Sequence, residues 1–145
     1  MQFSDLLQNH LLLNALVAWT AAQVLKTIIH AVVNRTLDIH RLFGDGGMPS
    51  GHSATVTALA ATAAIEYGLS SAVFAIAAIL AVIVMHDAMG VRLEAGKHAQ
   101  AINELLELFS SDLETDVKLK EFLGHTPLQV LGGALLGLVV AIILG

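Results

Sequence analysis

Residues 46–54 read Gly46-Gly47-Met48-Pro49-Ser50-Gly51-His52-Ser53-Ala54, and this stretch joins a polar loop to a long apolar run. The glycines allow backbone conformations that other residues avoid, Pro49 suits the start of a helix, and Ser50 can cap one. A helix that begins here directs unpaired N–H groups and the positive end of its dipole at the space in front, which favours an anion. His52 can exchange a proton near neutral pH. The stretch is equally compatible with a capped helix start that carries an incidental histidine.

The composition indicates an integral membrane protein. Only 13% of the 145 residues are charged, and the mean hydropathy is +0.75, whereas soluble domains have roughly 25% charged residues. A chain of this length forms one domain, which we expect to cover residues 1–145. The absence of cysteine excludes disulfides and thiolate metal sites. The net charge of −5 argues against a nucleic-acid partner, which would need a basic surface.

Four apolar runs predict four membrane helices, at residues 11–33, 53–66, 71–85 and 128–144. The first is long enough to cross a hydrocarbon core of roughly 30 Å at about 20 residues. The second is short, but its small residues suit the interior of a bundle, and Gly133 and Gly137 give the last run a close packing face. Gly68 is expected to end the second helix, and Ser70 to cap the third.

A segment between the third and fourth runs concentrates charged residues. Its apolar residues recur at helical spacing, at Ile102, Leu105, Leu106, Phe109 and Leu113. We expect an amphipathic helix on the membrane surface or over the mouth of the bundle, inside a surface insert of about residues 93–123. A solvated surface helix is the simpler interpretation, and a mobile lid is the alternative. The expected fold is an all-α integral membrane bundle of about four transmembrane helices plus one interfacial amphipathic helix.

The polar ends of these helices fall on one side of the bilayer, and that side carries basic residues and histidines. The opposite side has no Lys or Arg, so the positive-inside tendency predicts that the polar side is cytoplasmic. Cations beside a helix N-terminus suit phosphate, and two histidines can supply a nucleophile and a proton donor. Lys26 either reaches this interface or faces a polar interior, since a lysine within a membrane helix costs roughly 2.5–3.5 kcal/mol. The residues gathered on the polar side are Arg35, Arg41, His52, Asp87, Arg92 and His125.

Two motifs resemble signatures of the type 2 phosphatidic acid phosphatase superfamily, which includes the vanadium-dependent haloperoxidases. Pro49-Ser50-Gly51-His52 resembles the second signature. The stretch from Gly124-His125 to Gly137 resembles the histidine half of the third signature, and Val91-Arg92 resembles its arginine half, with the insert between them. This split, together with residues 46–48 and 87–92, is similar to the divergent, short branch of the superfamily. The resemblance covers residues 26–137.

The chain departs from the superfamily pattern at three points. Lys26 and Arg35 only approximate the first signature, because Thr36 stands at the expected proline, and Arg41 competes with Arg35. Gln129 replaces the aspartate that would orient the nucleophilic histidine. Arg92 and His98 also reproduce the usual spacing of arginine and histidine, but the residues that follow His125 match the signature and those that follow His98 do not.

The resemblance implies phosphomonoester hydrolysis without a metal or another cofactor. His125 would attack phosphorus and form a phosphohistidine, Gln129 would orient His125, and His52 would protonate the leaving oxygen. Asp87 would support Arg92. The groups that would bind the phosphate oxygens are Lys26, Arg35 or Arg41, Ser50, Gly51 and Arg92.

The expected function is therefore that of a membrane-bound lipid-phosphate phosphatase, acting on a phosphomonoester or an isoprenyl diphosphate. The alternative is a catalytically impaired membrane protein that keeps a phosphate or lipid-head-group site. The altered first signature and Gln129 favour the alternative, whereas His52, Arg92 and His125 favour the enzyme. The expected partners are the lipid phosphate and the bilayer, with self-association into a homo-oligomer left open.

Overall fold

The structure is a computed structural model that describes residues 3–36, 46–109, 119, 121 and 123–145. The described residues contain helices and no strand, so the all-α prediction is confirmed. In chain order the elements are the 3-10 helix η1 (Phe3–Gln8) and the α-helices α1 (His10–Asn34), α2 (Gly51–Tyr67), α3 (Ala72–Met89), α4 (Val91–Phe109) and α5 (Pro127–Leu144).

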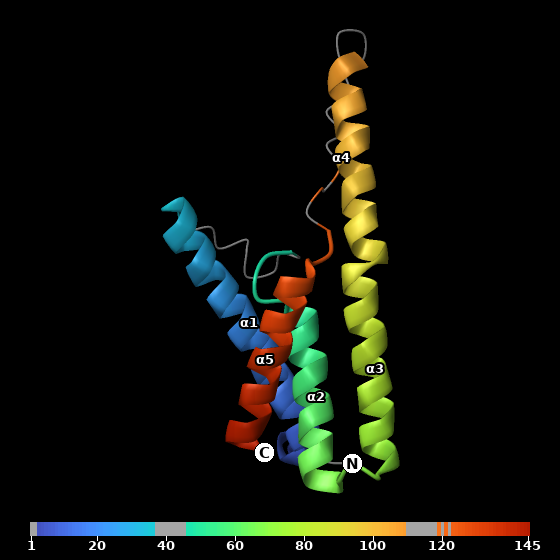
Figure 1. Ribbon diagram of the computed structural model, residues 1–145. Helices are drawn as coiled ribbons and strands as arrows, with labels where there is room; N and C mark the ends of the chain where they lie inside the picture. Colours follow the sequence, from blue (N-terminus) through green and yellow to red (C-terminus); the bar gives the residue numbers. More distant parts are fainter. Residues whose placement is uncertain (1–2, 37–45, 110–118, 120, 122) are drawn as a thin grey trace.

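Helix α2 lies at the centre of the bundle, and α1, α3 and α5 all pack against it (Figure 1). Alanines line the centre: Ala18 and Ala22 of α1 contact Ala54 and Ala58 of α2 in one buried cluster. Since alanine has a short side chain, the helix axes can approach closely. Helix α1 runs antiparallel to α2, and α5 runs parallel to it. The N-termini of α2 and α5 therefore open side by side at one end of the bundle, called the mouth below.

Glycines on α5 bring it into backbone contact with α2. A Cβ atom added to Gly133 would lie 2.3 Å from the carbonyl oxygen of Ser50, and one added to Gly137 would lie 2.3 Å from that of Ala54. The packing face predicted for Gly133 and Gly137 is thus confirmed. No larger residue fits at either position without a shift of one helix.

Within the part of the chain that the structure describes, three segments are long and apolar enough to cross a membrane: His10–Asn34, Ala72–Leu108 and Pro127–Leu144. Helix α2, with 17 residues, is shorter. It is surrounded by the other helices and carries a buried hydrogen bond from Asn14 Nδ2 to Thr62 Oγ1, 3.1 Å long. The structure thus fits a membrane bundle in which α2 is the innermost helix.

Local capping residues set most helix ends. Ser50 caps α2, as predicted, and Gly68 ends it. Ser71, rather than the predicted Ser70, caps α3, because its side chain accepts from the N–H of Phe74. Thr126 caps α5 in a capping box, in which its side chain accepts from the Gln129 N–H and the Gln129 side chain accepts from the Thr126 N–H.

Helix α4 continues from α3 beyond Gly90 and projects past the mouth (Figure 1). Its buried residues are Gly96, Ala99 and Asn103, whereas the predicted apolar stripe is exposed at Ile102 and Leu105. The helix spans Val91–Phe109, and residues 110–118 lie outside the described residues. Residues 119, 121 and 123 are not helical, and Leu113 lies outside the described residues.

Candidate functional site

Three parts of the chain meet at the mouth and place the residues of the candidate site. His52 lies in the first turn of α2, and His125 directly precedes the N-cap of α5. Arg92 lies in the first turn of α4, just after the break at Gly90. Residues that are far apart in sequence thus come together because α2 and α5 start side by side and α3 ends beside them.

A cavity of about 220 Å³ is enclosed by His52, Arg92, Ala95, Leu123, Gly124 and His125. The ring centroids of His52 and His125 are 5.7 Å apart, and the ring planes are inclined by 63°. The two histidines and the arginine that the sequence singled out therefore line one cavity. His98, the competing histidine, is exposed on α4 and does not line it.

The His125 side chain is 2% exposed, and the backbone holds the residue from both sides. Its N–H donates to the carbonyl oxygen of Ala88 in the last turn of α3, at 2.9 Å. Gly124 has a φ of +83°, and a Cβ atom there would lie 2.4 Å from the backbone nitrogen of Leu93. Only glycine allows this close approach, so Gly124 holds His125 directly beside the start of α4.

The Gln129 side chain determines which nitrogen of His125 carries a proton. Gln129 Oε1 lies 3.0 Å from the N–H of Thr126, which requires an acceptor at that position. The same oxygen lies 3.3 Å from Nδ1 of His125, so Nδ1 is the protonated nitrogen in this contact. The neutral ring then has its lone pair on Nε2, which is the form that a nucleophile requires.

Arg92 and Asp87 form an ion pair across the break between α3 and α4, with 2.6 Å between Nε of Arg92 and Oδ2 of Asp87. Both side chains are about half exposed, at 49% and 40%. Because Nε of Arg92 donates to Asp87, the two terminal nitrogens of the guanidinium group are not used in this bond. An arginine held in this way can offer two parallel donors to a phosphate.

Ser50 and Lys26 are buried near the mouth, but they do not line the cavity. The Ser50 N–H donates to the carbonyl oxygen of Gln129 at 3.0 Å, and its Oγ accepts from Ser53. Ser50 therefore joins α2 to α5, whereas the N-terminus of α2, from Gly51 onward, supplies the partial positive charge of the helix dipole. Lys26 is 4% exposed and lies along Gly47, where a Cβ atom would be 3.2 Å from its Cγ.

Two of the predicted phosphate-binding arginines are not found at the cavity in the part of the chain that the structure describes. Arg35 is the exposed C-cap of α1, whose end points away from the rest of the bundle (Figure 1). Arg41 lies outside the described residues. Sequence reasoning missed Ala95 and Leu123 as lining residues, because neither carries a chemical signal. The role of Gly124 could be suspected only from its position next to His125.

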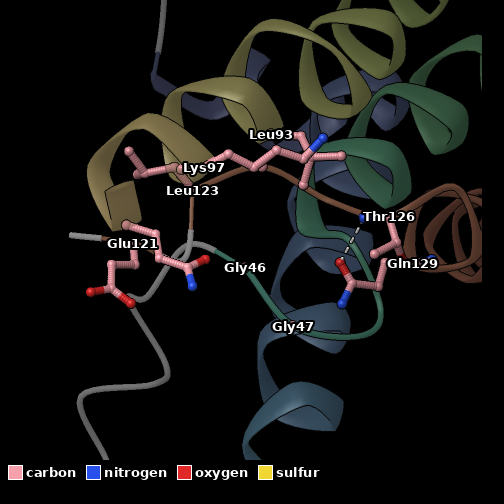
Figure 2. A pocket seen from close by; sticks show the side chains of 11 residues that line it. Gly46, Gly47, Leu93, Lys97, Glu121, Leu123, Thr126 and Gln129 are labelled. Atoms are coloured by element: carbon pink, nitrogen blue, oxygen red, sulfur yellow. Dashed lines mark hydrogen bonds between the residues drawn. The ribbon is translucent and has the colours of Figure 1, made fainter. Parts of the chain in front are cut away.

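A second cavity, of about 240 Å³, lies beyond Leu123 and Gly124, which line both cavities. Figure 2 shows its polar side chains, which include Lys97, Glu121 and Gln129, and the bond between Gln129 and Thr126. The amide of Gln129 thus lies between His125 and this second cavity. No group of three His, Cys, Asp or Glu side chains among the described residues is placed to hold a metal ion.

Comparison with known proteins identifies the family. A model described as the "Divergent PAP2 family" matches residues 7–140. The chain is also similar to the "Uncharacterized membrane protein YuiD" of Bacillus subtilis (strain 168), with 44% identity over 152 residues that cover 97% of this chain and 96% of the relative. No solved structure matches the chain. The chain is a membrane protein that belongs to the divergent PAP2 family.

Proposed function

We propose that the protein is a lipid-phosphate phosphatase that hydrolyses a phosphomonoester, or an isoprenyl diphosphate, through a phosphohistidine. The observation that carries the proposal is the pairing of His52 and His125, 5.7 Å apart, in one cavity with Arg92. Two histidines that line the same cavity can act on a bound phosphoryl group as nucleophile and proton donor. The cavity lies at one end of an apolar bundle, where the head group of a membrane lipid is also located.

In the first step, Nε2 of His125 attacks phosphorus, and the bond from phosphorus to the lipid oxygen breaks. His52, in its protonated form, donates its proton to that oxygen, so the lipid leaves as an alcohol from a phosphomonoester and as the isoprenyl monophosphate from an isoprenyl diphosphate. Oε1 of Gln129 accepts a hydrogen bond from the Nδ1–H of His125 and keeps the ring in the reactive tautomer. The product of this step is a phosphohistidine at His125 with a neutral His52.

In the second step, water attacks the phosphohistidine. The neutral His52 takes a proton from that water, the bond between phosphorus and nitrogen breaks, and inorganic phosphate is released. Arg92 and the positive end of the α2 dipole stabilise the charge on the equatorial oxygens in both steps. The buried ammonium of Lys26, beside Gly47, adds positive charge close to the start of α2.

The test is phosphate release by the purified protein from phosphatidate, from phosphatidylglycerophosphate and from an isoprenyl diphosphate. We expect turnover of at least one substrate, loss of turnover in His52→Ala and His125→Ala, and a mild effect in His98→Ala. Quenching at alkaline pH should trap acid-labile phosphate on the His125 peptide. Trapping that persists in His125→Ala, or that disappears in His98→Ala, would contradict the assignment.

A second function, binding of a phosphate or lipid head group without turnover, is favoured by one observation. Gln129 is neutral, and its oxygen already accepts from Thr126, so it stabilises a positively charged His125 less than an aspartate would. Saturable binding of inorganic phosphate, lost in Arg92→Ala, together with no phosphate release from any of the three substrates, would support this function over the enzyme.

A further inference from the structure

The segment that carries His125 runs back along α4 to the mouth. We call the described residues 119, 121 and 123–125 the return segment. Its far end touches Asn103 of α4, its middle lies against Gly96, and its near end is bonded to Ala88 through the N–H of His125. The position of His125 therefore depends on contacts that begin about three helical turns from the cavity.

Asn103 makes three hydrogen bonds to the described residues at the far end. It is 5% exposed, and its Nδ2 donates to the carbonyl oxygen of Leu119 at 2.8 Å and to Oε1 of Glu121 at 2.7 Å. Its Oδ1 accepts from the N–H of Leu119 at 2.9 Å. Both hydrogens of the amide and its oxygen are thus used to hold the return segment. An apolar residue of the same size would leave the backbone groups of Leu119 without these bonds.

The middle of the return segment has no freedom to move toward α4. A Cβ atom on Gly96 would lie 2.5 Å from the carbonyl oxygen of Glu121 and 2.9 Å from that of Leu123. Backbone therefore lies directly on backbone here, as it does again at Gly124. With this close contact, the bonds of Asn103 to Leu119 fix the register of the return segment along α4.

We propose that Asn103 is a positioning residue for His125. It sets the register of the return segment, and the segment in turn fixes His125 against Ala88 and opposite His52. Asn103 lies 11 residues from Arg92, which is roughly 16 Å along a helix with a rise of 1.5 Å per residue, so it acts without touching the substrate. The catalytic consequence rests on the proposed phosphatase function, whereas the structural consequence does not.

The first experiment needs no enzymatic activity. The membrane protein in detergent is treated with diethyl pyrocarbonate, and the modification of each histidine is followed by peptide mass spectrometry. Buried His125 should react more slowly than exposed His98 in the parent protein. In Asn103→Leu the reaction of His125 should accelerate several-fold, with His98 as the internal reference. Glu104→Ala, which removes an exposed neighbour bonded only to Gln100, is the matched control and should leave both rates unchanged.

The second experiment measures kinetics and rescue. Asn103→Leu should lower kcat by roughly 10- to 100-fold, as expected for a small displacement of a reacting group. KM should stay near the parent value, because Asn103 does not touch the substrate. The chain has no cysteine, so the double variant Asn103→Cys/Leu119→Cys can replace the hydrogen bonds by a disulfide. Oxidation of this variant should restore kcat, and reduction should lower it again.

The two experiments separate the possible failures. An unchanged reaction rate of His125 in Asn103→Leu would overturn the positioning role, even if the parent protein is an active phosphatase. If the parent protein shows no turnover but His125 reacts faster in Asn103→Leu than in the parent, the positioning role is supported and the phosphatase function is contradicted. A loss of kcat that the disulfide does not rescue, together with a lower Tm, would assign Asn103 to general stability and also overturn the proposal.

Discussion

Gln129 connects the elements of the site through its backbone and its side chain. Its carbonyl oxygen accepts from Ser50 of α2, its amide oxygen accepts from Thr126, and the same oxygen lies 3.3 Å from Nδ1 of His125. The capping box thus fixes the amide, and the amide fixes the tautomer of the histidine. Gln129 replaces the aspartate of the superfamily signature, and in the structure it forms the capping box at the start of α5.

Gln129→Glu should raise turnover. A carboxylate keeps the acceptor for Thr126 and for Nδ1, and it adds a charge that stabilises the positive imidazole ring. Hydrogen bonds to charged groups are stronger by about 1 kcal/mol, which corresponds to about a fivefold higher rate. The measurement is kcat for phosphate release at neutral pH. A lower kcat in a variant with an unchanged Tm would contradict the role of Gln129, and Gln129→Leu should be slower than both.

Arg92→Lys should lower activity sharply while the protein stays folded. Lysine keeps the charge but loses the planar guanidinium, whose Nε donates to Asp87 and whose two terminal nitrogens are the proposed donors to phosphate. Removal of one donor to a developing charge costs about 100-fold or more in kcat. Lys97→Arg, at an exposed ion pair with Glu94 on the same helix, is the matched control and should retain the parent rate. Parent-like turnover in Arg92→Lys would remove Arg92 from the site.

At the scale of elements, the sequence predicted those helix ends that are set by neighbouring residues in the chain. Ser50 as a cap and Gly68 as a helix end depend on neighbouring residues only, and both are found. The course of α4 could not be predicted, because it depends on contacts between Asn103 and Leu119, 16 residues apart. The role of Arg35 also escaped prediction, since it depends on the direction in which α1 leaves the bundle.

Gly133→Ala should damage both stability and activity. The added Cβ atom would lie 2.3 Å from the carbonyl oxygen of Ser50, so α5 must move away from α2, and His125 with it. Overpacking of this kind costs about 1–3 kcal/mol. Thermal unfolding in detergent and kcat report the two effects.

The neighbouring glycine is the control for this variant. A Cβ atom on Gly132 meets the flexible end of Met48 at 3.2 Å rather than backbone. Gly132→Ala should therefore keep a Tm and a kcat close to those of the parent. Equal losses in the two variants would show that the contact between α5 and Ser50 has no special role.

At the scale of the whole molecule, the chain is polarised along the bundle. The mouth carries the cavity, while the start of α1, the connection from α2 to α3 and the end of α5 lie at the other end (Figure 1). An exposed ion pair between His10 and Glu66, 2.7 Å long, joins α1 to α2 there. The distribution of Lys and Arg in the sequence already predicted this polarity, because six of the seven lie outside the four apolar runs, in segments expected on the mouth side.

The mouth should face the cytoplasm, by the positive-inside tendency. In intact cells, a membrane-impermeant maleimide should label Ser70→Cys, in the exposed connection between α2 and α3, but not Lys97→Cys on α4. After the cells are opened, both should be labelled. The parent protein itself should not be labelled, because the chain has no cysteine. Labelling of Lys97→Cys but not of Ser70→Cys in intact cells would place the mouth outside.

The hydrogen bond from the His125 N–H to the carbonyl oxygen of Ala88 can be followed by amide hydrogen exchange. The amide hydrogen of His125 is itself the hydrogen that joins the return segment to the last turn of α3. Its exchange with deuterated solvent therefore requires the site to open, so the protection of this one amide reports the free energy of opening of the assembled site. Ligands that bind only the assembled site should slow this exchange in proportion to their occupancy, whether or not they are turned over.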